Sequence, residues 1–268
     1  DHMRAAGLRR RTIEHRRYQL CVLGQAHLRR SPWSVKGDDL IRWLERQDWS
    51  PETRKSYRGA LRSFYGWGKQ AGHVRRDPAA DLPPVRIPRG EPRPISEGRL
   101  KTAIAQACDR TRLILVLGAY AGLRRAEIAG LRWADVSDGQ LHIVGKGGHV
   151  RLLHVHPLLA AELAAEQTRR DAGRFGTGWR YTGHADSPHV FPGRYGTGVT
   201  ADSIGRAAAR ALDGHTTHSL RHRFATRAYD ATRDIGVVQQ LLGHASPTTT
   251  AGYARADRTA MRDAVNAL

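Results

Sequence analysis

The chain has 268 residues, of which 44 are Lys or Arg and 25 are Asp or Glu, so its formal net charge at pH 7 is +19. This excess argues against a neutral metabolic enzyme and indicates a polyanionic partner, either nucleic acid or an anionic membrane surface. The hydrophobic content of 40% is enough for a folded core and excludes a basic disordered tail.

Cysteine usage and hydropathy point to the cytosol. Cys21 and Cys108 are too few for a disulfide framework, and we expect both to be buried in a reducing compartment. The longest apolar stretch, residues 113–122, is shorter than the ~20 residues that a bilayer-spanning helix needs. No long apolar segment of a signal peptide follows the Arg-rich N-terminus.

A proline-rich linker over about residues 83–95 is predicted to separate two domains, residues 1–90 and 96–268. Its five prolines stiffen an extended segment and do not suit a helix interior. An ordinary loop inside one domain is the alternative. Residues 1–90 hold 20 basic and 9 acidic residues, whereas the remainder holds 24 and 16, so the smaller domain is the more densely charged.

The first domain is predicted to be all-helical. Apolar periodicity over residues 11–28 predicts a helix with Tyr18 and Cys21 among its inward positions. Asp38 or Asp39 is expected to cap a short second helix.

A third helix, after Ser50, carries the most basic face of this domain. Ser50 is a favourable N-cap, and Pro51 suits the first helical position. Because few acidic side chains balance the basic ones, we expect this face to contact DNA phosphates. A solvated surface is the alternative. The basic side chains are Arg54, Lys55, Arg58, Arg62 and Lys69.

The second domain is predicted to be mixed, so that the chain is mainly α with a small antiparallel β-sheet (an α+β fold). Two β-rich runs, 141–144 and 150–155, flank a glycine-rich turn typical of a hairpin. Ser96 is expected to cap the first helix of this domain. The expected helices span residues 96–108, 111–120, 126–131, 157–170, 200–211, 218–230, 234–242 and 256–267.

Two segments of this domain carry cations at sharp turns. Arg124 follows Gly122 at the start of a helix, where burying its charge without an anion would be costly. Glu127 can pair with Arg124 or Arg125, so a structural ion pair is the alternative to an anion site. Lys146 lies at the tip of the glycine-rich hairpin, where most lysines serve only solubility.

A second pair of segments adds titratable groups. His218 and Arg221 share a helical face, which places an imidazole beside a permanent cation as phosphoryl transfer requires. His218 and His222 also have the spacing of zinc ligands, but no acidic general base lies between them and no third ligand is evident.

Further along the chain, His244 leaves a helix end at Gly243. Tyr253 lies among small residues that would leave its hydroxyl accessible. A core position is the alternative for this tyrosine.

Together and in this order, the four segments resemble the tyrosine recombinases, the phage integrase family of site-specific DNA recombinases. AGLRRAE resembles the first arginine box, GKGG the lysine hairpin, HSLRH the His-x-x-Arg box, LLGH the His/Trp segment, and TTTAGY ends on the nucleophile position. SPETRKSYRGALRSFYGW resembles the helical core-binding domain, so the resemblance covers about residues 8–262. It implies catalytic roles for Arg124, Lys146, His218, Arg221, His244 and Tyr253, with Glu127 in support.

The resemblance implies a DNA strand transferase. The two arginines and His244 would hold the scissile phosphate while Tyr253 attacks it, giving a 3′-phosphotyrosine and a free 5′-hydroxyl. His218 would assist proton transfer, and Lys146 would protonate the leaving oxygen. Neither a metal ion nor ATP is expected, because cations bind the phosphate and the covalent link keeps the bond energy.

The implied partners are double-stranded DNA attachment or core sites and three further copies of the chain around a Holliday junction. A helix at 256–268 would join protomers of the tetramer, although it could instead pack on its own subunit. An accessory directionality or bending protein is possible in this family. The protein would act in the cytoplasm or nucleoid of a bacterial host, integrating or excising a phage or mobile element.

The same sequence pattern is compatible with several alternatives. The same residues would serve a resolvase of chromosome dimers or an activity like that of a type IB topoisomerase. A non-catalytic DNA-binding regulator on this fold is a further class, as is RNA binding through bulk charge. The core-binding helices begin almost at once, which leaves no room for an N-terminal arm-binding domain. The chain is therefore either a small two-domain form or one from which that domain was removed.

Overall fold

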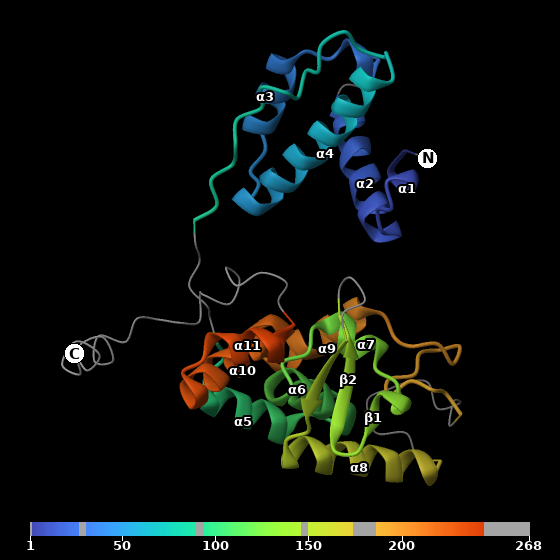
Figure 1. Cartoon of the computed structure of the whole chain (residues 1–268), viewed down its shortest axis with the longest axis vertical. Coiled ribbons are helices and arrows are strands. Elements are labelled where there is room, and N and C mark those ends of the chain that lie inside the picture. The colour runs from blue at the N-terminus through green and yellow to red at the C-terminus, as the bar shows by residue number, and fades with distance from the viewer. Residues whose placement is uncertain (1, 27–30, 89–93, 146–149, 174–185, 244–268) are drawn as a thin grey trace, which may run out of the picture. The chain divides into compact units, whose positions relative to one another are not determined.

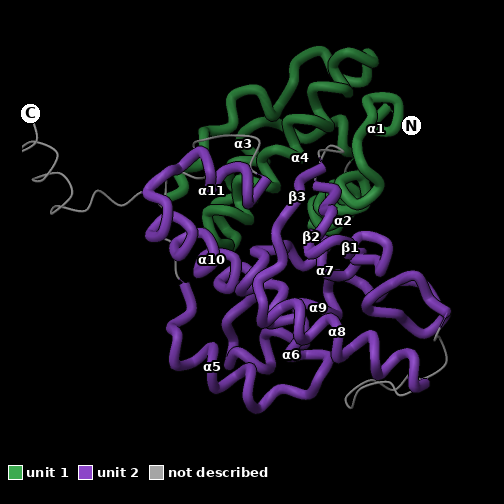
Figure 2. Tube along the Cα trace, turned by 60° about the horizontal axis from the view of Figure 1, so that its bottom comes forward, with its two compact units in different colours: residues 1–90 green, residues 91–268 purple. Residues whose placement is uncertain are grey.

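The computed structural model describes residues 2–26, 31–88, 94–145, 150–173 and 186–243. The chain divides into two compact units, Asp1–Gly90 and Glu91–Leu268 (Figure 2). Each has its own hydrophobic core. Within the described residues, no helix is long and apolar enough to cross a membrane. The expected elements at Lys146, His244, Tyr253 and the terminal helix at 256–268 lie outside these ranges.

The first unit is helical, as expected (Figure 1). Ser50 caps α4 by accepting a hydrogen bond from the backbone N–H of Thr53, and Pro51 is the first residue of that helix, so both predictions are confirmed. Stacked and edge-on aromatic rings of Trp43, Trp49 and Tyr57 fill part of the core. The elements are α1 (His2–Ala5), α2 (Arg10–Ala26), the 3-10 turn η1 (Pro32–Ser34), α3 (Gly37–Glu45) and α4 (Pro51–Gln70).

The predicted inward positions Tyr18 and Cys21 of α2 are wrong. Tyr18 is 63% exposed and Cys21 is also exposed, whereas Gln19 and Leu23 are buried. The amide of Gln19 donates to the Ser56 hydroxyl of α4 at 2.9 Å, so a polar side chain occupies the interface with its hydrogen bond satisfied. The expectation that both cysteines are buried is likewise incorrect, because Cys21 is exposed and Cys108 is only partly buried.

The predicted cap of α3 is also wrong. The N-cap is Lys36, and Asp39 lies in the first turn, where its carboxylate accepts a hydrogen bond from the Lys36 backbone N–H at 3.1 Å. An acidic side chain at this third helical position satisfies the N–H of the N-cap residue itself, and the N-cap lies two or three residues before the predicted Asp38 or Asp39.

The second unit surrounds one buried helix, α6. Leu113, Leu115 and Leu117 are fully buried, and α6 contacts α5, α8, α9 and α10 (Figure 1). Ser96 caps α5, as predicted. The helices are α5 (Glu97–Gln106), α6 (Asp109–Tyr120), α7 (Arg125–Gly130), α8 (Pro157–Asp171), α9 (Ala201–Ala211), α10 (Thr217–Thr232) and α11 (Ile235–Leu242), with a 3-10 turn η2 (Trp133–Asp135).

A three-stranded antiparallel sheet completes this unit, in the order β1-β2-β3. The predicted hairpin strands are confirmed as β2 (Gln140–Val144) and β3 (Val150–His154), while β1 (Val136–Ser137) is an additional short strand. Ile143 pairs with Arg151 in the register of β2 and β3, so Arg151 lies on the inward face of the sheet.

Candidate active site

A turn after the central helix presents Arg124. Gly122 adopts a left-handed conformation with φ of +61°, and a Cβ at this position would lie 2.5 Å from the Phe224 ring, so no other residue fits without rearrangement. Arg124 then serves as the N-cap of α7. Its backbone N–H and its Nη1 each donate to the Glu127 carboxylate at 2.8 Å. Glu127 therefore pairs with Arg124, whereas Arg125 lies 3.5 Å from Asp202.

A second arginine, which the sequence analysis missed, reaches the same carboxylate from the sheet. Arg151 donates from Nη1 to Oε1 of Glu127 at 3.1 Å and from Nη2 to Oε2 at 2.8 Å. The side chains of Arg151 and Glu127 are only 8% and 7% exposed. Residues alternate between the two faces of a strand, so Arg151 lies on the same inward face as Leu153. A charged residue at such a position is the sequence signal that indicates a buried ion pair.

Arg221 joins two chain turns from α10. Thr216 caps this helix, and Arg221 is 2% exposed. Its Nη1 donates to the Gly122 carbonyl, and its Nη2 donates to the Leu242 carbonyl at 2.6 Å. The turn before Arg124 and the end of α11 are thus held by one guanidinium.

The C-terminal end of α11 lies beside all three arginines. Gly243 ends this helix in the left-handed conformation, and its carbonyl accepts a hydrogen bond from Arg124 Nη2 at 3.4 Å. A Cβ on Gly243 would lie 3.1 Å from Arg151 Cδ. Cations suit this position because a helix C-terminus carries partial negative charge. His244 is the next residue in the chain, and it lies outside the described residues.

The electrostatics of this cluster favour bound anions. Burial opposes ionisation of Glu127, but hydrogen bonds from Arg151 and Arg124 outweigh it and hold the pKa of Glu127 below its usual value. Burial, together with the charges of Arg221 and Arg124, lowers the pKa of His218. An anion bound between these cations would offset the repulsion that Arg221 and Arg124 exert on His218, and would favour its protonated imidazole.

His218 and His222 lie one turn apart on α10, with ring centroids separated by 4.2 Å. Burial lowers the pKa of His222 to about 4, with further contributions from His218 and Arg221. His222 is therefore neutral at pH 7. Among the described residues, no group of three or more His, Cys, Asp or Glu side chains is arranged to hold a metal ion.

The basic face predicted on α4 has a structural role in its own unit. Arg58 donates through Nε and Nη2 to the Leu82 carbonyl at 3.0 and 2.8 Å, and Arg62 donates to the Ala80 carbonyl at 3.3 Å. Arg54 similarly donates to the Gln47 carbonyl. Lys55 and Lys69 are exposed. Contact of this face with DNA stays a prediction.

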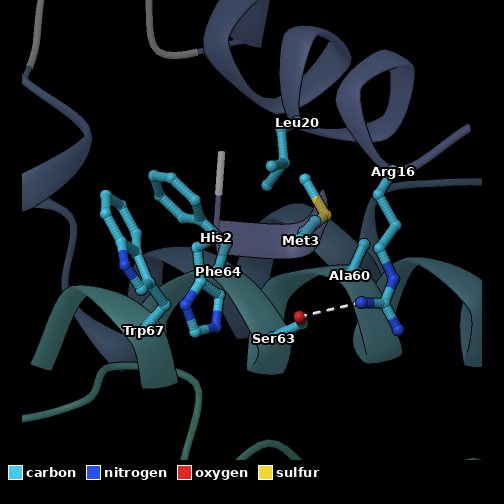
Figure 3. A pocket seen from close by; sticks show the side chains of 8 residues that line it. All are labelled: His2, Met3, Arg16, Leu20, Ala60, Ser63, Phe64 and Trp67. Atoms are coloured by element: carbon cyan, nitrogen blue, oxygen red, sulfur yellow. Dashed lines mark hydrogen bonds between the residues drawn. The ribbon is translucent and has the colours of Figure 1, made fainter. Parts of the chain in front are cut away.

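A separate cavity of about 200 Å³ lies within the first unit, between α1, α2 and α4 (Figure 3). Leu20, Phe64 and Trp67 line it, and Arg16 donates to the Ser63 hydroxyl at 2.9 Å at its edge. This lining is mainly apolar, so the cavity lacks the convergent polar groups that a catalytic pocket needs. The arginine cluster of the second unit is the stronger candidate.

Comparison with known proteins assigns the chain to a family. The model of the phage integrase family matches residues 96–259. The chain therefore belongs to the phage integrase family.

Two curated relatives extend this result. The tyrosine recombinase XerC of Xanthomonas campestris pv. campestris (strain B100) is 32% identical over 225 residues, covering 79% of this chain and 66% of the relative. The XerC of Xylella fastidiosa (strain 9a5c) is 33% identical over 211 residues, covering 74% of this chain and 68% of the relative. The chain thus spans about two thirds of the length of these relatives.

Solved structures confirm the predicted fold class. A lambda integrase (75–356) dimer bound to a COC′ core site has a TM-score of 0.72 at 15% identity, covering 93% of this chain and 90% of that chain. The Tn1549 transposon integrase (aa 82–397) in complex with circular intermediate DNA has a TM-score of 0.69 at 21% identity, covering 98% and 96%.

Proposed function

We propose that the chain is a site-specific DNA recombinase that cleaves and rejoins DNA through a 3′-phosphotyrosyl intermediate and a Holliday junction. The observation that carries this proposal is the convergence of Arg124 and Arg221 at the end of α11. Arg221 is bonded to the carbonyls of Gly122 and Leu242, and Arg124 is bonded to that of Gly243. Two arginines fixed in this way are suited to bind the non-bridging oxygens of one phosphodiester.

The reaction is a transesterification that conserves the number of phosphoester bonds. The Tyr253 hydroxyl attacks phosphorus, a bond forms between its oxygen and the 3′-phosphate, and the bond to the 5′-oxygen breaks. His218 assists removal of the phenolic proton, and Lys146 donates a proton to the 5′-oxygen. The 5′-hydroxyl of a partner strand then reverses the steps. The roles of Lys146, His244 and Tyr253 rest on the sequence pattern.

The proposal includes double-stranded DNA and a ring of four protomers as partners. Its support is the structural neighbour described as a lambda integrase tetramer bound to a Holliday junction, which has a TM-score of 0.71 at 16% identity and 92% coverage of this chain. The 256–268 segment would link protomers, and an accessory protein would set direction. We expect no metal ion, because the cations already present would bind the phosphate, and no ATP, because the covalent link keeps the bond energy. The protein would act in the bacterial cytoplasm.

The biological purpose has two candidates. Integration or excision of a mobile element uses the proposed chemistry, and so does the resolution of chromosome dimers. The curated relatives are named XerC rather than phage integrase, which favours the second candidate. A plasmid carrying two copies of the target site would distinguish the roles, because a resolvase separates direct repeats whereas an integrase also joins two unlike sites.

The test is covalent capture on a pool of nicked duplexes with a randomised core sequence. A nick beside the cleavage point lets the short 5′-hydroxyl fragment diffuse away, so the covalent adduct accumulates. We expect the unmodified chain to form an SDS-resistant adduct, in EDTA as well as without it, and Tyr253→Phe to form none. Adducts of equal yield from both proteins, or DNA binding without any adduct, would contradict the proposal. Loss of the adduct in EDTA would contradict its metal independence.

A type IB topoisomerase-like enzyme would pass this capture test, so a second measurement is needed. Such an enzyme would relax supercoiled plasmids irrespective of the selected sequence. A recombinase would exchange strands only between plasmids that carry it.

A further inference from the structure

We propose that Arg151 is a positioning residue for the scissile phosphate: it fixes the Glu127 carboxylate that orients Arg124 and offsets the negative charge of that carboxylate. The inference rests on the proposed function, because the anion in question is a phosphate of DNA. It adds a residue to the site that lies on β3 and not in any of the segments from which the site was first predicted.

The geometry locks the carboxylate in one orientation. Oε1 of Glu127 accepts from Nη1 of Arg124 at 2.8 Å and from Nη1 of Arg151 at 3.1 Å. Oε2 accepts from the Arg124 backbone N–H and from Nη2 of Arg151, both at 2.8 Å. Because Arg151 binds both oxygens, the carboxylate cannot rotate without breaking a bidentate pair. Arg124 therefore binds a carboxylate whose orientation is already fixed by Arg151.

Arg124 and Arg151 differ in their exposure to solvent. The Arg124 side chain is 36% exposed, whereas those of Arg151 and Glu127 are 8% and 7% exposed. Arg124 is thus the more accessible of the two to a DNA phosphate, and both Nη atoms of Arg151 are already bonded to Glu127. A pair of Arg124 and Glu127 alone would be neutral, but the addition of Arg151 gives the trio a net charge of about +1 in a poorly solvated place. The positive charge that attracts the phosphate remains with the exposed guanidinium.

A second contact places Arg151 beneath the end of α11. Its Cδ and Nη1 both lie 3.1 Å from the position that a Cβ on Gly243 would occupy. Arg124 reaches the carbonyl of the same Gly243. Arg151 therefore supports both the phosphate-binding arginine and the helix end to which it is bonded, which is a positioning role and not a contact with substrate.

The experiment compares single-turnover cleavage of the captured duplex by three variants. We expect Arg151→Met to lower the cleavage rate about tenfold or more, because the site stabilises the charge of the transition state. DNA affinity should change less than about threefold, because the scissile phosphate is only one of many phosphate contacts. The cleavage rate of Arg151→Lys should lie between those of the unmodified chain and Arg151→Met, because Lys keeps the charge without the bidentate geometry. Arg151→Met combined with Glu127→Gln should cleave at least about threefold faster than Arg151→Met alone, because it restores the net charge.

Arg112→Met is the matched control. Arg112 lies in the first turn of α6, bridges Asp109 and Glu162, and is 28% exposed, so its replacement removes the same charge from the same unit without touching Glu127. Its cleavage rate should stay within about twofold of the unmodified chain. A double variant no faster than Arg151→Met, or an Arg151→Met rate equal to the control, would overturn the proposal.

A phosphate titration separates this inference from the proposed function. Inorganic phosphate should raise the thermal unfolding midpoint of the full chain relative to chloride at equal ionic strength. This rise should be smaller in Arg151→Met and regained in the double variant. If the unmodified chain forms no adduct with any duplex, the proposed function fails, and this titration alone decides the role of Arg151. A response in Arg151→Met equal to that of the unmodified chain would then overturn the positioning role. If Arg151→Met does not fold, Arg151→Lys and the double variant supply the comparison.

Discussion

Arg221 donates a hydrogen bond from α10 to the carbonyl of Gly122, the left-handed residue that ends the central helix and turns the chain toward Arg124. Because the other amino group of Arg221 binds the Leu242 carbonyl, one buried guanidinium relates the first arginine segment to the end of α11. The position of Arg124 consequently depends on the backbone of a glycine as well as on Glu127.

The first prediction concerns that glycine. Gly122→Ala introduces a Cβ at a φ of +61° and within 2.5 Å of the Phe224 ring. We expect the free energy of unfolding to fall by about 2–4 kcal/mol, from backbone strain and overpacking together. Gly98→Ala is the control, because Gly98 lies in α5 with nothing within 4 Å of its Cβ position. It should stabilise by up to about 1 kcal/mol. Urea unfolding measures both, and equal effects would refute the argument.

The second prediction is a pH dependence. The folded pKa of His222 is about 4, below its ordinary value of 6.5, because burial and neighbouring cations disfavour the charged ring. Between these pH values the unfolded chain binds more protons, so stability falls as pH decreases from about 6.5 toward 4. His222→Gln should reduce the slope of unfolding free energy against pH in this window. His218 shifts in the same direction and leaves a residual slope. An unchanged slope in His222→Gln would contradict the assignment.

The third prediction separates two cations of α4. Lys55 is exposed, whereas Arg58 binds the Leu82 carbonyl through two nitrogens. Lys55→Met should leave stability within about 0.5 kcal/mol and reduce the slope of log affinity against log salt by about 0.9, as expected for one lost phosphate contact. Arg58→Met should destabilise the unit by about 1–3 kcal/mol, because a carbonyl loses its donor. A salt slope unaffected by Lys55→Met would place this face away from DNA.

The fourth prediction tests the tail. Deletion of residues 257–268 should spare binding to a single site and weaken recombination between two sites, if this segment joins protomers around a closed ring. Gel-shift titration and a two-plasmid recombination assay measure the two steps separately. Recombination at the full rate would rule out the tail as the link between protomers.

Features within one helix or turn could be predicted from the sequence. Ser50 and Ser96 were expected to cap helices because capping involves residues within three positions of each other. The proximity of Arg124 and Glu127 follows from the same local spacing.

Features that depend on packing between distant segments could not. The partnership of Glu127 with Arg151 joins α7 to β3. Alternation along β3 indicates that Arg151 points inward, but no local pattern specifies its partner. Similarly, the hydrogen bonds from Arg58 to the Leu82 carbonyl give a residue of the basic face a structural role that its own helix does not reveal. Tyr18 and Cys21 of α2 were misplaced because the buried position belongs to Gln19, whose amide is satisfied by Ser56, and hydrophobic periodicity does not detect a buried polar residue.

The central claim is that Tyr253 becomes covalently bound to DNA. Tryptic digestion of the adduct after nuclease treatment, followed by mass spectrometry, identifies the linked residue. The peptide 234–255 contains Tyr253 as its sole tyrosine. We expect this peptide to carry a nucleotide through its 3′-phosphate, and the same peptide from Tyr253→Phe to be unmodified. A nucleotide linked to any other residue, or a 5′-phosphate linkage, would contradict the account.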